Sequence, residues 1–274
     1  MGNYTLFGGN GFIGSEIYKK LTASGHQVDI RGRSDAVPDN QDLGNVIYCA
    51  GNGNCVNAPF DVFRANTELL AKILENNRFE HLLYMSSTRV YMNQENSGEN
   101  DDLTICSDDK RRLFNLTKLV AEELLLRSGK NITIVRPGNV YGLALNSPLF
   151  LPSIIRNAIN NKKVDMYVPK HYAKDYVSVD CVAEVCCSIS ASHQQWHGQI
   201  INVAAGYNIT AEQIGEVLVT ETGCDLVWHD CDGFNEYFPE TDIALAAEKI
   251  DGFRSSDMLK DLRTMIQDYK NNIE

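Results

Sequence analysis

The feature that most constrains the fold of this chain is a glycine-rich stretch close to its N-terminus. Residues 8–14 read Gly-Gly-Asn-Gly-Phe-Ile-Gly. They follow a short apolar run at residues 3–7 and precede residues 15–24, whose apolar positions have helical spacing. This order predicts a strand, a tight turn and a helix.

The glycines of the predicted turn suit phosphate binding. Gly8 permits a turn that a Cβ would block, Gly11 lets the backbone approach a pyrophosphate, and Gly14 lets the helix pack close to the sheet. The helix begins near Phe12 and Ile13, and its N-terminus directs free N–H groups and a partial positive charge at the phosphates. The spacing is G-x-x-G-x-x-G instead of the standard G-x-G-x-x-G, but its place between strand and helix predicts a dinucleotide site.

Composition narrows the class of protein. The chain has 274 residues, of which 43% are hydrophobic, enough for one α/β domain and a smaller lobe. Its net charge of −11 argues against a nucleic-acid or anionic-membrane binder, and no apolar run could cross a bilayer. The cysteines form no C-x-x-C pair and the histidines show no metal-ligand spacing, so no metal is expected. With no signal peptide visible, we expect a cytoplasmic protein.

The end of the predicted second strand bears on the choice of cofactor. Dinucleotide folds usually carry Asp or Glu here, which binds the ribose 2′-OH, or Arg where a 2′-phosphate must fit. In this chain the position is Gly32, flanked by Arg31 and Arg33 and followed by Ser34. Asp29 competes, but it lies mid-strand and we expect it to point elsewhere. The pattern therefore predicts NADP over NAD.

The middle of the sheet is predicted to be abbreviated. Residues 35–44 are too short and polar to hold both a helix and a third strand. A buried strand at residues 45–50 then leads to Gly51, a further position for close approach to the cofactor. Another strand at residues 81–85 ends just before Ser87. Because strand carboxyl ends line the ligand crevice, Ser87 is placed either for chemistry or as a strand-end cap.

Ordered motifs extend this pattern over nearly the whole chain. They are Gly8–Gly14, Ala50-Gly51, Ala65-Asn66-Thr67, Ser86-Ser87, Val90-Tyr91, Lys118-Leu119, Ala121-Glu122, residues 136–142, 174–180 and 201–203. Together they resemble the extended short-chain dehydrogenase/reductases, in the nucleotide-sugar epimerase/dehydratase branch. The resemblance implies an α/β fold: a Rossmann-like doubly wound parallel sheet with a small C-terminal α/β substrate lobe.

The resemblance also implies a division of the chain. Residues 1–142 would form the dinucleotide-binding domain, shortened after strand two. Residues 143–274 would form mainly the substrate lobe, with segments around 174–203 returning to the sheet. A homodimer would form through the helices around residues 60–76 and 112–127.

Further site residues follow from the same resemblance. Besides the glycine loop, Arg31, Arg33 and Ser34, it implies cofactor contacts at Ala50, Gly51, Asn66, Lys118, Pro137 and Val140. It implies contacts with a nucleotide-sugar substrate at Thr88, Asn139 and Lys174. Lys174 stands where the family usually has an arginine on the diphosphate, so it keeps the charge but loses the bidentate fork.

The catalytic set is where the chain departs from the family. Ser87 and Lys118 match the family's Ser/Thr and Lys, but the tyrosine position is Phe114. A tyrosine beside a lysine exchanges a proton with the sugar, whereas phenylalanine has none to give, and such a loss costs ~10²–10⁴ in rate. Phe114 is an inactivating substitution, or another group such as Tyr91, Thr88 or a water does its work, or catalysis is lost.

The sequence narrows the type of reaction mainly through family motifs that it lacks. Thr88-Arg89 replaces the Asp-Glu that follows the catalytic residue in 4,6-dehydratases, which disfavours dehydration. With NADP(H) expected, the first hypothesis is a reductase of a nucleotide-linked keto-deoxysugar. The alternatives are a nucleotide-sugar epimerase with tightly held NAD(P) and a non-catalytic NADP-binding regulator.

Overall fold

Six parallel strands form the central sheet of the chain. A computed structural model describes residues 2–32, 35, 37–255 and 257–273. The strand order is β2-β1-β3-β4-β5-β9. Their bounds are β1 Asn3–Phe7, β2 Gln27–Arg31, β3 Asn45–Tyr48, β4 His81–Met85, β5 Ile132–Pro137 and β9 Gln199–Val203. β3, β4 and β5 are buried along their whole length, as expected for inner strands covered on both faces.

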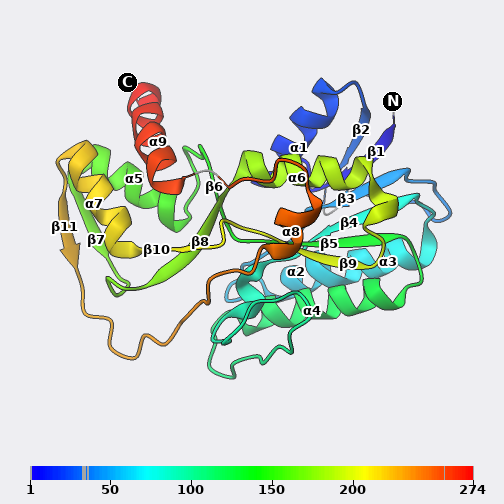
Figure 1. Cartoon of the computed structure of the whole chain (residues 1–274), viewed down its shortest axis with the longest axis horizontal. Helices are drawn as coiled ribbons and strands as arrows, with labels where there is room; N and C mark the ends of the chain where they lie inside the picture. The colour runs from blue at the N-terminus through cyan, green and yellow to red at the C-terminus, as the bar shows by residue number, and fades with distance from the viewer. Residues whose placement is uncertain (1, 33–34, 36, 256, 274) are drawn as a thin grey trace.

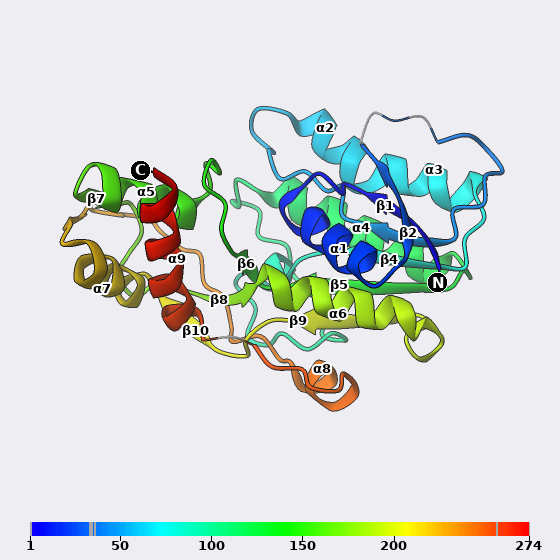
Figure 2. The same ribbon diagram turned by 90° about the horizontal axis from the view of Figure 1, so that it is seen from above.

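Helices cover both faces of this sheet, which confirms the predicted Rossmann-like arrangement. On one face α1 (Phe12–Ala23) packs beside α6 (Val179–Ala191), and on the other α3 (Leu69–Asn76) packs beside α4 (Arg112–Arg127) (Figures 1 and 2). Each face has its own apolar core, built around Ile17 and Val182 on the first and around Ile73 and Leu125 on the second.

The connection between β2 and β3 is short. The residues described between them, 32, 35 and 37–44, contain no helix and no named strand. In the strand order, β2 is the edge strand of the sheet on this side. Gly44 enters β3 with a φ of +61°, where an added Cβ would lie 2.6 Å from the Asn3 carbonyl oxygen. The chain returns to the sheet centre directly, without the third strand of a full doubly wound fold.

The helix predicted at residues 60–76 is interrupted. It consists of α2 (Pro59–Phe63), a π-helical turn (Arg64–Glu68) and α3. Such turns occur often at functional sites. This one carries Asn66, whose side chain is fully buried.

The remaining elements form a smaller lobe. A three-stranded sheet, β10-β8-β6, comprises Asn208–Thr210, Ala173–Ser178 and Asn139–Tyr141, and β11 (Asp225–Trp228) pairs with β7 (Lys163–Met166). Helices α5 (Phe150–Asn160), α7 (Ala211–Thr222) and α9 (Met258–Ile273) share an apolar core that includes Ile155, Leu218 and Leu262. Thr210 and Gln213 form a capping box at the start of α7.

A long segment links this lobe back to the sheet. It leaves β11, crosses below the molecule in Figure 1 and reaches α8 (Ala244–Lys249), which packs near β9. On the way it passes the loop that follows β4. Residues from both halves of the sequence therefore meet at the carboxyl edge of the sheet.

Candidate active site

The glycine turn has the geometry that its sequence predicts. Gly8 has a φ of +81°, and an added Cβ would lie 2.8 Å from the backbone nitrogen of Ala50. A Cβ on Gly14 would overlap the Gly8 carbonyl oxygen, so α1 can approach the turn only with glycine there. No side chain forms a capping hydrogen bond with the N-terminus of α1, and the first turn of this helix, whose residues the structure describes, contains no acidic residue. Its N–H groups can therefore meet an anion, which fits the pyrophosphate of a dinucleotide.

Three of the expected cofactor residues come together beyond β3. A Cβ on Gly51 would lie 2.9 Å from Lys118 Nζ and 3.2 Å from Asn66 Oδ1. Asn66 accepts a hydrogen bond from Asn52 N at 2.8 Å and donates to Thr117 Oγ1 at 2.9 Å. The π-helical turn and α4 are thus joined at the carboxyl end of β3, and a side chain at position 51 would require the Lys118 ammonium to shift.

Lys118 is held inside the protein. It is 4% exposed, and its Nζ donates a hydrogen bond to the Met85 carbonyl oxygen at 2.7 Å, at the end of β4. Burial lowers the pKa of Lys118 to about 8. An exposed helix lysine would show neither property, so Lys118 is part of the site's interior.

Phe114 lies one helical turn before Lys118. Its ring centroid is 5.7 Å from Lys118 Nζ and 5.0 Å from Arg111 Cζ. A cation at that range can lower the pKa of a phenol. The surroundings of position 114 therefore suit a tyrosine, although the ring present carries no proton to exchange.

Ser87 follows β4 and begins the short 3₁₀ helix Thr88–Tyr91. Its Oγ accepts a hydrogen bond from Arg89 N at 3.1 Å, so it does serve as a cap. The hydroxyl keeps its own proton and a second lone pair, and Ser87 is only partly buried. Capping and contact with a substrate oxygen are therefore compatible.

Tyr91 does not replace the missing tyrosine. Its hydroxyl donates to Asn202 Oδ1 at 2.9 Å and accepts from Arg136 Nη1 at 2.6 Å. Arg136 also forms a buried pair with Glu122, with Nη2 and Oε2 2.5 Å apart. Tyr91 is 1% exposed. Its proton is committed to a structural network that joins β5, β9 and α4.

The expected substrate residues meet beside this network. Thr88, Tyr91 and Asn139 line a small cavity of about 10 Å³ together with Asp175 and Phe238. Asn139 Nδ2 donates to the Asp175 carbonyl oxygen at 3.0 Å. Asp175 is held in turn by the N–H groups of residues 205 and 206.

Lys174 lies against the aromatic wall of the same region. Its Nζ is 5.1 Å from the ring centroid of Phe238 and 4.9 Å from that of Tyr172. Burial lowers the pKa of Lys174 to about 8. Lys174 is therefore a half-buried cation that packs against the two aromatic rings.

The end of β2 carries an ion pair and a nearby carboxylate. Asp29 does not point away from Arg31: its Oδ2 lies 2.6 Å from Arg31 Nε. Residues two apart in a strand share a face, so Asp29 and Arg31 can pair; whether Asp29 faces the cofactor stays a prediction. Gly32 N donates to Asp35 Oδ2 at 2.6 Å, so a carboxylate does lie beside the glycine. Arg33 and Ser34 lie outside the described residues.

A large cavity adjoins this end of the sheet. It has a volume of about 980 Å³ and is lined by the loop after β2, at Asp35 and Val37, and by Asn52, Arg64 and Glu68 near the π-helical turn. The other predicted cofactor residues, Pro137 and Val140, lie farther along the crevice, at the end of β5 and on β6. The residues that line this cavity include none from the glycine turn, and neither Pro137 nor Val140, so the cavity covers only the side of the sheet edge next to β2 and the π-helical turn.

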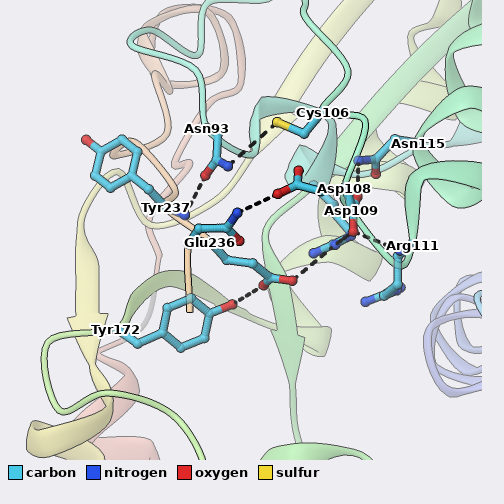
Figure 3. Close-up of polar contacts among 11 residues, drawn as sticks. Asn93, Cys106, Asp108, Asp109, Arg111, Asn115, Tyr172, Glu236 and Tyr237 are labelled. Carbon is cyan, nitrogen blue, oxygen red and sulfur yellow. Dashed lines mark hydrogen bonds and ion pairs between the residues drawn. The ribbon is translucent and has the colours of Figure 1, made fainter. Parts of the chain in front are cut away.

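Two residues that sequence reasoning missed lie beside Lys174 and Phe114. They are Arg111, on the Phe114 ring, and Glu236, which accepts a hydrogen bond from Tyr172 OH at 2.7 Å (Figure 3). Neither residue belongs to a sequence motif, and Glu236 lies in the irregular segment between β11 and α8.

Among the described residues, no group of three or more His, Cys, Asp or Glu side chains could hold a metal ion. No helix there is long and apolar enough to span a membrane.

Comparison with known proteins identifies the class. The family model described as the NAD dependent epimerase/dehydratase family matches residues 4–204. The chain belongs to this family. Comparison with curated proteins finds no match.

Solved structures share the fold at low sequence identity. MoeE5 in complex with UDP-glucose and NAD is 18% identical, covering 100% of both chains with a TM-score of 0.80. The UDP-N-acetylglucosamine 4-epimerase of Methanobrevibacter ruminantium M1 in complex with UDP-N-acetylmuramic acid is 20% identical over 99% of each chain, with a TM-score of 0.80. The dTDP-glucose 4,6-dehydratase of Bacillus anthracis in complex with NAD is 16% identical over 98% of this chain and 97% of its own, with a TM-score of 0.81.

Proposed function

We propose that this chain binds a nicotinamide dinucleotide and a nucleotide-linked sugar, and that its site is built for redox chemistry at a sugar carbon. The observation that carries the proposal is Lys118. A buried ammonium, with its pKa lowered to about 8, lies at the carboxyl end of β4, beside Gly51 and one turn from position 114. A bound nicotinamide would supply or accept the hydride.

The chain's own residues would position the sugar and its proton. The Ser87 hydroxyl would donate a hydrogen bond to the reacting oxygen. A phenol at position 114 would exchange the proton, and Lys118 would keep the pKa of that phenol low. Phe114 removes the proton donor, so the chain as it stands would act ~10²–10⁴ times more slowly than its tyrosine form.

We propose NAD(H) as the cofactor, in place of the NADP(H) that the sequence favours. The charge of Arg31 is paired with Asp29, and the Asp35 carboxylate lies at the Gly32 N–H. A carboxylate there suits a ribose 2′-OH and repels a 2′-phosphate. MoeE5 and the Bacillus anthracis dehydratase were solved with NAD, which supports the proposal.

Within this class we favour epimerisation of a nucleotide sugar. An enzyme that holds NAD and regenerates it each cycle needs no NADPH, and the neighbours include a UDP-sugar epimerase. The sugar would lie near Thr88 and Asn139, with its diphosphate toward Lys174. The second candidate is an NADP(H)-dependent reductase of a nucleotide-linked keto-deoxysugar, which Arg31 and Arg33 favour. A non-catalytic dinucleotide-binding regulator is the third, which Phe114 favours.

Product analysis separates these candidates. The Phe114→Tyr variant is incubated with NAD⁺ or NADPH and a panel of nucleotide sugars and their 4-keto-6-deoxy forms. An epimer without net cofactor change supports the epimerase, and NADPH consumed mole for mole supports the reductase. No product from any sugar, with the dinucleotide bound, would reject both.

We also propose a cytoplasmic homodimer. All eight cysteines are free thiols, which suits a reducing compartment. Apolar side chains are exposed on the outer face of α4 at Leu116, Val120 and Leu124, each 40% or more accessible, and Phe60 of α2 is 75% accessible. Such a face is typical of a surface that a second copy covers.

A further inference from the structure

Glu236 occupies a cationic pocket beside the proposed substrate site. Its Oε2 accepts a hydrogen bond from Tyr172 OH at 2.7 Å (Figure 3). Its Oε1 is 3.4 Å from Arg89 Nη2. Burial works to raise the pKa of Glu236, but the Tyr172 hydroxyl and the charges of Arg89 and Lys174 hold it below its usual value. The carboxylate is therefore the anion that this pocket binds in the structure.

Arg89 forms its shorter ion pair with Asp109 and still has a hydrogen-bond donor available for another anion. Its Nη2 is 2.7 Å from Asp109 Oδ1, so the contact with Glu236 is the longer of its two ion pairs. Arg89 is 7% exposed, yet its Nε has no hydrogen-bond partner among the described residues. A buried donor without a partner is costly, and an anion larger than one carboxylate could satisfy it.

Lys174 adds a second cation with no hydrogen-bond acceptor. Its Nζ lies over the rings of Tyr172 and Phe238, and no described residue accepts a hydrogen bond from it. Arg89 Cζ lies 6.0 Å from the centroid of the same Phe238 ring. The two cations therefore share one aromatic wall next to Glu236.

Arg111 connects this pocket to the reaction centre. Its backbone N–H donates to Asp109 Oδ1 at 2.8 Å, the oxygen that also meets Arg89. Its guanidinium lies on the ring of Phe114, and no described residue accepts a hydrogen bond from that group. An anion held here would lie between position 114 and Lys174.

The charges of the pocket favour a doubly charged ligand. Arg89, Arg111 and Lys174 face two carboxylates, Asp109 and Glu236. If Glu236 moves away, two positive charges are left over, which matches a diphosphate. In a chain of net charge −11 such a local excess marks a binding site.

We propose that Glu236 is a placeholder carboxylate, which a substrate diphosphate displaces to bind Arg89, Arg111, Lys174 and the Tyr172 hydroxyl. This rests on the proposed function for the kind of substrate, but the pocket itself is defined by the contacts above. Displacement would move the segment between β11 and α8, which is tied down nearby by paired hydrogen bonds between Asn93 and Tyr237. Binding and movement of that segment are thus coupled.

The test uses inorganic pyrophosphate as the probe, with NAD⁺ saturating so that the glycine turn does not compete for it. Calorimetry gives its Kd for the chain and for two variants. Glu236→Gln keeps the shape and the acceptor for Tyr172 but removes the competing charge, so binding should tighten by roughly three- to tenfold. Arg111→Ala should weaken it by about tenfold, because a charge-assisted hydrogen bond is lost.

Matched variants control for a general change in charge. Glu240→Gln removes the same charge from an exposed position of the same segment, and Lys110→Ala removes a cation next to Arg111. Neither should change the Kd more than twofold.

Two results would overturn the proposal. One is weaker or unchanged binding in Glu236→Gln, which would mean that Glu236 is itself a ligand contact or a bystander. The other is no pyrophosphate binding by any variant. If the pocket behaves as proposed but Phe114→Tyr turns over no nucleotide sugar, the proposed function fails and the anion site stands.

Discussion

At the scale of single residues, the proposed site combines a buried lysine, Lys118, with a phenylalanine, Phe114, at the position where a proton-exchanging phenol is expected. Lys118 is desolvated and bonded to the Met85 carbonyl oxygen, which fixes its ammonium near position 114. Burying a lysine carries a cost in free energy that an exposed helix position would avoid. That cost is understandable if the ammonium acts on a neighbouring group.

Lys118 should control the pH dependence of a restored enzyme. In the Phe114→Tyr background, Lys118→Met removes the cation that stabilises the phenolate, so the pKa of the tyrosine should rise. We expect turnover at neutral pH to fall by ~10² or more and the pH–rate profile to shift to higher pH. Lys110→Met, an exposed neighbour, should leave the profile in place. An unchanged profile in the Lys118 variant would remove it from the chemistry.

Asp35 should set the preference between NADH and NADPH. Asp35→Asn keeps an acceptor for Gly32 N but removes the charge that disfavours a 2′-phosphate. We expect NADH binding to weaken by about tenfold and NADPH binding to tighten, as measured by fluorescence titration. Asp225→Asn, which removes an exposed carboxylate from β11 in the smaller lobe, is the control. Equal changes for both cofactors would contradict this role.

At the scale of elements, the sequence predicts what local patterns encode. The glycine turn, the apolar strands and the helix at Arg112–Arg127 appear where their periodicity indicates. The sequence does not predict the π-helical turn at Arg64–Glu68, because residues 64–68 are of types that an ordinary α-helix also contains. Glu236 could not be found either, since its contact with Arg89 spans 147 positions of sequence.

Helix α4 presents an apolar stripe that packing within the chain does not use. Leu116, Val120 and Leu124 recur every four residues and are 42%, 49% and 40% accessible. Val120→Glu should therefore dissociate the proposed dimer, as seen by sedimentation velocity, with the far-ultraviolet circular dichroism unchanged. Leu126→Glu, on the same helix but off this stripe, should not. A monomer already present in the unmodified chain would contradict the dimer.

At the scale of the whole molecule, the proposed ligand site lies at one edge of the sheet and a buried histidine lies at the other. His81 begins β4, is 0% exposed, and bonds through Nε2 to Thr133 Oγ1 at 2.9 Å. Its ring stacks on His193 with centroids 5.1 Å apart. Burial lowers the pKa of His81 to about 3, helped by the charges of His193 and His197.

This histidine should make the fold acid-sensitive. Below pH 6.5 the unfolded chain takes up a proton at His81 that the folded chain does not, so stability is complete above that pH and declines as pH falls toward 3. The slope approaches ~1.4 kcal/mol per pH unit. Urea denaturation of His81→Gln should show a correspondingly flatter profile. The comparison cancels other groups such as Asp175, whose pKa burial raises to about 6 and whose effect has the opposite sign. Parallel profiles would exclude His81 as the cause.

The most direct test of the account is a comparison of the chain with its Phe114→Tyr variant. Both are loaded with NAD⁺, mixed with nucleotide sugars, and followed by the near-ultraviolet absorbance of the reduced nicotinamide together with chromatography of the sugars. We predict that both bind dinucleotide and nucleotide equally, and that tyrosine raises the rate of sugar conversion by ~10²–10⁴. Equal rates in the two chains, or no conversion by either despite full binding, would contradict a redox site that lacks only its proton donor.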